Sequence, residues 1–341
     1  MTQKNSGCLW MLAGFGLCLG LIFTVGVFAV MNNPGKRSAP KFEESIVVDA
    51  SAPHDGKGSA EKIALIHLRG IITSAEPGSV GETMVDDLRI QLEQAALDKD
   101  VKAVVLHVDS PGGEVTASDV IYNAVRKVRD GGFGPENKKP VVVYMGSLAA
   151  SGGYYVACAG SHLMANETTL TGSIGVIMQS LNYRKLMDKV GLETETFKSG
   201  AFKDMLSGSR EMRDDERVYV QKMIMATYGK FVGIVARERR RNEDELRTGL
   251  ADGRIISGKD AKEAGLIDSL GQVDDAYAMA RELGKAKGAA IIRYESPFHL
   301  GRLLRILGQS EKSRVEVHVT QSLLPKLEAG RLYFLPSFYA P

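Results

Sequence analysis

Cysteine and net charge are both scarce in this chain, and each scarcity excludes a class of protein. The 341 residues include three cysteines, of which Cys8 and Cys18 lie in an apolar segment near the start. Cys158 is therefore alone in the rest of the chain, where no internal disulfide can form, and its apolar surroundings predict a small core residue. The 43 basic and 41 acidic residues leave a net charge of +2. That balance gives no electrostatic footprint for nucleic acid or for an acidic partner.

Signatures of bound cofactors are also missing. The sequence has no metal-ligand spacing, no phosphate-binding glycine loop and no dinucleotide fingerprint, so we expect no cofactor and no metal. The six histidines are scattered along the chain: His54, His67, His107, His162, His299 and His318. None of them has the neighbours of a catalytic triad, and we expect packed or surface residues at all six positions.

One long apolar segment is present, from Cys8 to Met31, and it carries no charged residue. It exceeds the roughly 20 residues that a helix needs to cross a bilayer, so we predict a transmembrane helix over 8–31 after a cytoplasmic N-terminus of residues 1–7. A cleaved signal peptide is the competing interpretation, because Val27-Phe28-Ala29 resembles a cleavage site, although such signals have apolar regions of only about 7–15 residues. More basic residues follow the segment than precede it. Because basic residues tend to stay on the cytoplasmic side, this weakly favours the opposite orientation, with the residues after the segment in the cytoplasm.

The composition of the whole chain is that of a globular protein, with 44% apolar and 25% charged residues. Residues 32–61 are rich in Pro, Ser, Ala, Gly and charge, which predicts a linker. Strand-like and helix-like patterns then alternate, which predicts an α/β fold with a largely parallel sheet. The expected elements are strands over 63–68, 103–108 and 141–144, and helices over 83–97, 117–129 and from 151 onward.

A longer helix is predicted between Asp215 and Arg237, where apolar residues recur at helical spacing for core or subunit contacts. The basic run 237–241 would close this helix in solvent, with a partner or lipid contact as the alternative. Because the chain changes character near Gly288, we place one domain over 62–288 and a C-terminal extension over 289–341.

Ser151 and Lys203 are the residues that carry chemistry. A serine hydroxyl is a poor nucleophile until a base takes its proton, and nothing near Ser151 in the sequence supplies a histidine with a carboxylate. A lysine can serve instead, because burial in an apolar pocket disfavours its charged form. The pair therefore predicts a Ser–Lys dyad, whose contact must come from the fold because the two residues are too distant to share a helix face. Asp204 is expected to turn away from the lysine into an ion pair.

The neighbourhood of Ser151 also suits a developing negative charge. A strand that ends at Tyr144 and a helix that begins at Ser151 place the hydroxyl at a helix N-terminus, where backbone N–H groups lack internal partners. The amide of Gly152 is therefore a candidate donor to the oxyanion of an acyl-transfer reaction.

Five motifs follow one another in a characteristic order. They are Asp109-Ser110-Pro111-Gly112-Gly113, Ala149-Ala150-Ser151-Gly152-Gly153-Tyr154-Tyr155, Thr171-Gly172-Ser173-Ile174-Gly175, Ser199-Gly200-Ala201-Phe202-Lys203-Asp204 and Gly265-Leu266-Ile267-Asp268. Together, over about residues 62–278, they resemble the bacterial signal peptide peptidase A proteases in their short, single-repeat form.

The resemblance implies a fold and further site residues. The fold is the spiral of ββα units of the Clp and crotonase superfamily. The resemblance makes the amide of Gly113 a second oxyanion donor beside Gly152, and it makes Ser173 a hydrogen-bond partner that orients Lys203. A plain tight turn is the alternative interpretation for the glycines, and a turn cap is the alternative for Ser173.

The resemblance further implies a membrane-anchored serine endopeptidase with its protease domain on the extracytoplasmic side of the cytoplasmic membrane. Such an enzyme degrades remnant signal peptides and other apolar peptides through an acyl-enzyme on Ser151, and its copies assemble into a dome-like ring. One alternative is the related stomatin-associated Ser–Lys membrane protease, which would carry further C-terminal spans. The other is a non-catalytic ring scaffold, whose signature would be the loss of Ser151 or Lys203.

The end of the chain is apolar from Leu332 to Tyr339 and is interrupted by Pro336. We predict that it docks on a ring surface or in an active site as an extended strand paired through its backbone, and that it acts as a regulatory plug. The alternative is simple packing over an apolar patch of the domain surface.

Overall fold

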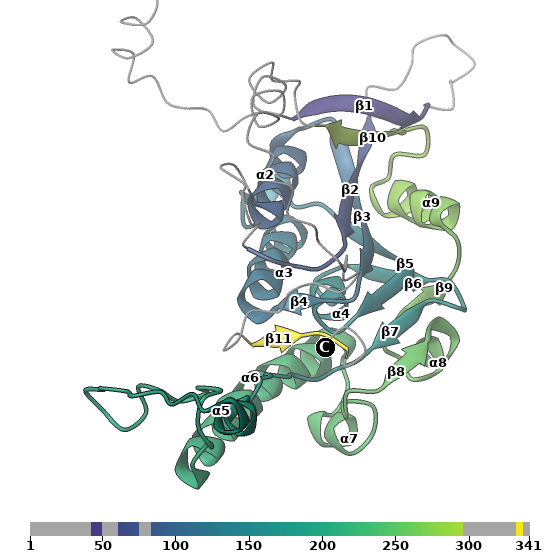
Figure 1. Ribbon diagram of the computed structural model, residues 1–341. Coiled ribbons are helices and arrows are strands. Elements are labelled where there is room, and N and C mark those ends of the chain that lie inside the picture. Colours follow the sequence, from purple (N-terminus) through teal and green to yellow (C-terminus); the bar gives the residue numbers. More distant parts are fainter. Residues whose placement is uncertain (1–41, 50–60, 75–82, 296–331, 337–341) are drawn as a thin grey trace, which may run out of the picture. The chain divides into compact units, whose positions relative to one another are not determined.

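The computed structural model describes residues 42–49, 61–74, 83–295 and 332–336, which belong to one compact unit that starts at Phe42. A sheet with helices on both faces organises this unit (Figure 1). The predicted transmembrane segment 8–31 lies outside the described ranges. Within those ranges, no helix combines the length and the apolar character needed to cross a bilayer.

The main sheet is largely parallel, as the alternating patterns predict. In spatial order its path is β1 (Glu43–Val48), β10 (Ala290–Glu295), β2 (Lys62–Arg69), β3 (Val101–Ser110), β5 (Val141–Ala150), β6 (His162–Ala165) and β9 (Ser269–Leu270). Only β1 on this path is antiparallel to its neighbour. Off the path, β7 (Leu170–Gly172) pairs in parallel with the end of β5, and β8 (Ile255–Ser257) runs antiparallel to β7. The described strands therefore confirm an α/β fold built around a mostly parallel sheet.

Strand β3 shows why the central strands are continuous apolar runs. Val104 and Leu106 face one core, whereas Ala103 and Val105 face another on the opposite side of the sheet. A strand covered on both faces needs apolar residues at successive positions. Helices α2 (Met84–Leu97), α3 (Val115–Asp130) and α4 (Gly152–Ala157) cover the first face, and α9 (Val273–Leu283) covers the second (Figure 1).

The predicted helix boundaries agree with the structure because local signals fix them. Thr83 and Asp86 form a reciprocal capping box at the start of α2, and Gly131 ends α3 in the left-handed conformation, with φ 82°. Cys158 follows α4 and is buried, which confirms its prediction as a core residue.

The sheet extends beyond the predicted domain of residues 62–288 at both ends. Strand β1 lies inside the segment predicted as a linker over 32–61, and β10 lies past residue 288. These two segments pair with each other, and β10 also pairs with β2. Most of β1 is solvent-exposed, so its sequence carries little of the apolar pattern that marks the central strands.

Helix α6 (Asp214–Arg239) divides into two parts. Its second half is buried through residues such as Phe231 and Val235, whereas its first half is largely exposed. The basic run at its end does not simply lie in solvent, because Arg239 is mostly buried and forms an ion pair of 2.6 Å with Asp268. The sequence pattern did not predict this ion pair, because Asp268 is distant along the chain and only the tertiary fold brings it to the end of the helix.

Candidate active site

Ser151 stands in a strained turn between β5 and α4. Its backbone has φ 53° and ψ −114°, a conformation that non-glycine residues rarely adopt and that concentrates at functional sites. The amide of Ser151 donates to the carbonyl of Gly172 at 2.8 Å, and its carbonyl accepts from the amide of Tyr155 at 2.8 Å. The side chain is buried, yet its Oγ finds no hydrogen-bond partner among the described residues. A buried hydroxyl held without a partner is available for chemistry.

The glycine turn after β3 packs directly against this serine turn. Gly112 has φ 104°, and a side chain at this position would collide with the backbone of Gly152 and with the carbonyl oxygen of Phe334. A Cβ on Gly152 would lie 3.1 Å from the amide nitrogen of Gly113. The fold therefore brings together the two backbones predicted to supply oxyanion donors, Gly113 and Gly152. Their catalytic role stays a prediction.

Ser173 lies next to the nucleophile through the chain itself. It is buried, follows the residue whose carbonyl binds the Ser151 amide, and has φ 50°. Its own amide donates to the carbonyl of Arg254 at 2.7 Å. This placement suits a residue that orients a catalytic base beside Ser151, and that role is not tested by the contacts.

Lys203 is placed differently. It lies on a projecting part of the protein that we call the arm, residues 178–230, which includes α5 (Arg184–Val190) and the first half of α6 (Figure 1). The Lys203 side chain is exposed, and the Oγ of Ser151 has no partner in the described residues. Within one chain, the Oγ of Ser151 therefore forms no hydrogen bond with Lys203.

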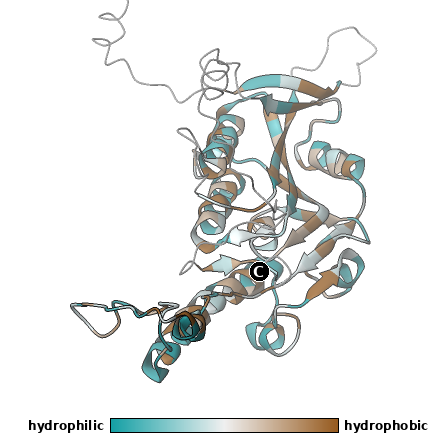
Figure 2. Ribbon diagram, viewed as in Figure 1, coloured by the Kyte–Doolittle hydropathy of each residue, from teal (hydrophilic) through white to brown (hydrophobic). Residues whose placement is uncertain are grey.

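The arm exposes many large apolar side chains, and Figure 2 shows apolar colour on it as well as on the central strands. The exposed side chains are Leu181, Tyr183, Leu186, Val190, Leu192, Phe197, Phe202, Val218, Tyr219 and Met225. A concentration of this kind marks a surface that contacts another molecule.

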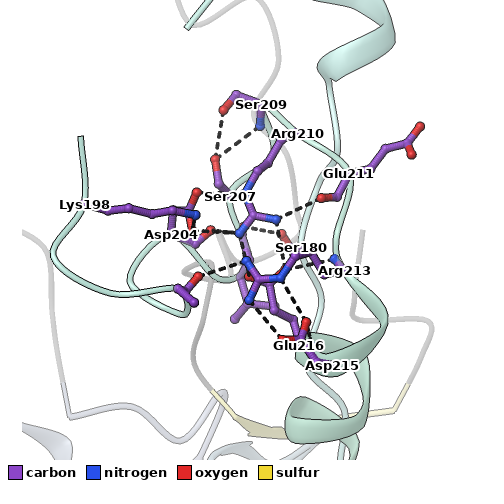
Figure 3. A network of polar contacts seen from close by, with 12 residues as sticks. Ser180, Lys198, Asp204, Ser207, Ser209, Arg210, Glu211, Arg213, Asp215 and Glu216 are labelled. Atoms are coloured by element: carbon purple, nitrogen blue, oxygen red, sulfur yellow. Dashed lines mark hydrogen bonds and ion pairs between the residues drawn. The ribbon is translucent and has the colours of Figure 1, made fainter. Parts of the chain in front are cut away.

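Asp204, the neighbour of the lysine, turns into an ionic network, as predicted (Figure 3). Arg210 and, less strongly, Lys198 hold the pKa of its carboxyl well below the usual range. Arg210 also lowers the pKa of Glu216 to about 2. Both carboxylates are thus ionised and paired at neutral pH.

The chain's own C-terminal segment lies along the glycine turn. Strand β11 (Tyr333–Phe334) pairs antiparallel with β4 (Gly113–Glu114), and Tyr333 exchanges two backbone hydrogen bonds of 3.1 Å with Ile177 on its other side. The tail prediction is therefore confirmed as far as a strand paired through its backbone, over the described residues 332–336. The remaining tail positions up to Tyr339 lie outside the described residues, and the plug function stays a prediction.

Phe334 packs against the buried rings of Tyr155 and Phe231, which we call the aromatic pocket. It is 1% exposed, and its ring centroid lies 5.0 Å from that of Tyr155 and 4.8 Å from that of Phe231. Such pairs add stability beyond the area that they bury. Tyr155 belongs to α4, so the pocket is built on the helix that starts at the nucleophile.

The histidines in the described ranges do not contact Ser151. His162 begins β6 rather than ending a helix, and its Nε2 lies 2.8 Å from the Oγ of Ser269. His67 and His107 have tilted rings whose centroids lie 5.1 Å apart, and they line a cavity of about 650 Å³ with Tyr144. Burial, helped by Arg69, lowers the pKa of His67 to about 4. Ser151 does not line that cavity. Among the described side chains, no three potential metal ligands converge.

Sequence patterns did not single out the aromatic pocket or the pairing of Arg210 with Glu216. One usable signal was present: the run from Arg210 to Glu216 alternates bases and acids densely, right after the lysine motif. The partner of each charge still depends on the fold, because the run offers several pairings.

Comparisons with known proteins agree with this geometry. The model of peptidase family S49 matches residues 135–287, and that of Clp protease matches residues 61–182. A candidate signal peptide peptidase SppA of Enterococcus faecium is 34% identical over 241 residues, which cover 70% of this chain and 68% of the relative. A candidate protease of Methanocaldococcus jannaschii is 40% identical over 203 residues, covering 60% of this chain and 63% of the relative.

Protease 4 of Salmonella typhi is 37% identical over 227 residues, which cover 66% of this chain but only 35% of that longer protein. The matched regions contain the strained Ser151 turn, and the S49 match also contains Ser173 and Lys203. With this sheet, this turn and these relatives, the chain belongs to peptidase family S49 and is a serine protease similar to signal peptide peptidases.

Proposed function

We propose that this protein is a membrane-anchored endopeptidase that cleaves remnant signal peptides and other apolar peptides through an acyl-enzyme on Ser151, with Lys203 as general base. One observation carries the proposal: an extended apolar segment, β11, is paired through its backbone with Gly113, in the glycine turn that packs against Gly152, the residue after the nucleophile. Backbone pairing supplies affinity and side-chain pockets supply specificity when a peptide binds as an added strand. A peptide substrate can use the same position.

The dyad is completed between two copies of the chain. Ser151 is buried without a base, whereas Lys203 is exposed on an arm whose apolar side chains need a covering surface. In a ring, each copy offers one surface to the copy before it and another to the copy after it. The arm of one copy then delivers its lysine to the serine of the next.

In the reaction, the neutral amine of Lys203 takes the proton of the Ser151 hydroxyl as its Oγ attacks the peptide carbonyl. The amides of Gly113 and Gly152 donate to the oxyanion, and the N-terminus of α4 adds its positive potential. The lysine ammonium returns its proton to the leaving amine, and water then hydrolyses the ester on Ser151. Ser173 orients the amine.

Substrate preference follows from the pocket of Tyr155 and Phe231 that holds Phe334. Its apolar, aromatic lining favours a large apolar side chain of the peptide, which is the character of signal peptide cores.

The segment 8–31 anchors the protein in the cytoplasmic membrane with the protease domain outside. The sheet and its helices belong to a spiral of ββα units. The ring of copies admits unfolded or short chains.

The two alternatives predict different observations. A non-catalytic scaffold has no reason to hold a buried serine hydroxyl in a strained turn, so the geometry of Ser151 favours an enzyme. The stomatin-associated protease shares the dyad, and a comparison of hydrolysis of signal peptides with hydrolysis of stomatin-derived peptides separates the two.

A fluorophosphonate probe tests the nucleophile. We expect one covalent adduct on the purified full-length protein in detergent, located on Ser151 by peptide mass spectrometry, because this hydroxyl alone sits at the proposed oxyanion site. Ser147, an exposed serine four residues earlier, serves as the internal control. An adduct on Ser147 or on several serines equally would contradict the assignment.

Peptide turnover should be low at mildly acidic pH and should rise toward alkaline pH, because only the neutral amine of Lys203 can accept a proton. The initial rate measured between about pH 5 and pH 10 checks this. His162→Gln should leave the profile unchanged, since His162 contacts Ser269 and not Ser151. A flat profile, or one whose rise disappears in His162→Gln, would exclude a lysine base.

Removal of the tail from Leu332 onward should increase turnover of a short apolar peptide severalfold, because β11 occupies the strand position beside Gly113. Intact-mass analysis after long incubation should show shortening of the wild-type protein and none of Ser151→Ala. The substitution Phe334→Ser should raise turnover in the same direction, since it empties the aromatic pocket. Identical masses together with unchanged turnover in both variants would leave only the packing interpretation of the tail.

A further inference from the structure

The loop that carries Lys203 is fixed on its C-terminal side by Arg210 (Figure 3). The guanidinium donates to both carboxylate oxygens of Asp204, at 2.8 Å each, and to the Asp204 carbonyl at 3.1 Å. Lys198 adds a further contact of 2.8 Å to the same carboxylate. The residue that follows the lysine is therefore held through both its side chain and its backbone.

Arg210 simultaneously holds the start of α6. It donates to the two carboxylate oxygens of Glu216 at 2.6 and 2.9 Å. Glu216 is fully buried, and it also accepts the amide of Arg213 at 2.9 Å, which closes the first turn of the helix. A planar guanidinium with five donors can bridge two carboxylates in this way, whereas a lysine ammonium cannot reproduce the fork.

The N-terminal side of the loop is fixed as well. Arg213 donates to the carbonyl of Ala201 at 2.9 Å, and its guanidinium lies over the ring of Phe202 at 5.3 Å. Phe202 in turn packs against Tyr219 of α6 at 5.6 Å. The residues on both sides of Lys203 are thus anchored to α6, while the Lys203 side chain is exposed and forms no ion pair with any described residue.

We propose that Arg210 is a positioning residue for the catalytic base. By bridging Asp204 to Glu216, it holds Lys203 in the position from which its amine reaches Ser151 of the neighbouring copy. This inference rests on the proposed Ser–Lys function.

A residue that only stabilised the arm would behave differently. Loss of the arm's fold would disrupt the assembly of copies and reduce every activity together. Loss of positioning alone leaves assembly and peptide binding intact, because the peptide position is formed by β4, Ile177 and the pocket around Tyr155, none of which touches Arg210 in the described contacts. The turnover number then falls while KM stays constant.

The test uses the full-length protein in detergent and compares Arg210→Gln with Arg210→Lys. Arg184→Gln is the matched control, since Arg184 lies on the same arm and its side chain forms an exposed ion pair of 3.7 Å with Asp188. We measure kcat and KM for one apolar peptide, with oligomeric size by sedimentation velocity. Lys203→Ala is run in the same assay.

We expect Arg210→Gln to lower kcat by roughly 10- to 100-fold at constant KM and constant oligomeric size, because small misplacements of a catalytic group have effects of that order. Arg210→Lys should lose less activity, and Arg184→Gln should match the wild type.

Wild-type kcat in Arg210→Gln would overturn the inference, and so would a loss of activity that always accompanies a loss of assembly in both Arg210 variants. Failure of the proposed function has a separate signature, since Lys203→Ala would then keep its turnover. An inactive Lys203→Ala together with a fully active Arg210→Gln overturns the positioning role alone.

Discussion

Replacement of Ser151 or Lys203 by alanine is expected to lower peptide turnover by more than about a thousandfold, and the double variant should be no worse than either single one. The reason is that the two groups act as one unit: without the base the hydroxyl is not activated, and without the hydroxyl the base has nothing to deprotonate. Initial rates on one apolar peptide, with circular dichroism to verify folding, measure the effect.

Two nearby substitutions serve as controls for the dyad. Ser147→Ala removes an exposed hydroxyl from the same strand end, and Lys189→Ala removes an exposed charge from the same arm. Both should keep wild-type turnover. A Lys203→Ala variant with near-normal turnover would reject a lysine base, whereas partial activity in Ser173→Ala is compatible with its orienting role.

Gly112→Ala should reduce turnover by roughly 100- to 1000-fold, which is the usual effect of losing an oxyanion donor. The new methyl group would collide with the backbone of Gly152 and with the position taken by the Phe334 carbonyl, so the two proposed donor backbones must separate. Turnover is measured on the fraction of the variant that is soluble and folded, and thermal unfolding of the same sample is recorded.

Gly70→Ala is the matched control for that substitution. Gly70 also has a positive φ, 76°, but a Cβ there meets nothing within 4 Å. It therefore introduces backbone strain of the same kind without a collision at the nucleophile. Equal turnover in Gly70→Ala and Gly112→Ala would show that strain alone explains the loss, and would count against the oxyanion assignment.

Much of the fold was predictable because its signals are local. The apolar run of β3 is a property of neighbouring residues, and it predicted a strand that the structure contains. Strand β1 was missed because its exposed residues lack that pattern and its stability comes from pairing with β10, far along the chain.

The residues of the candidate site were likewise predictable only where the signal is local in the sequence. Ser151, Gly113 and Gly152 could be named because each lies in a short contiguous motif, and their catalytic roles stay predictions. The apolar composition of the tail correctly indicated a segment that is buried over the described residues. The partner of the tail, β4, could not be deduced, since apolarity predicts burial and not its location. The lack of a hydrogen bond between Lys203 and Ser151 within one chain was equally hidden, because a contact between distant residues depends on the tertiary fold.

We propose that Ser151 of one copy works with Lys203 of another, and a mixture of two inactive variants distinguishes this arrangement from a dyad within one chain. Ser151→Ala and Lys203→Ala proteins are dissociated, mixed in equal amounts and reassembled, with two different affinity tags to verify that they co-assemble. We predict that turnover returns to roughly a quarter of the wild-type value, since about one neighbouring pair in four then combines an intact serine with an intact lysine across the interface. A mixture that co-assembles and stays inactive would exclude a dyad formed between two copies.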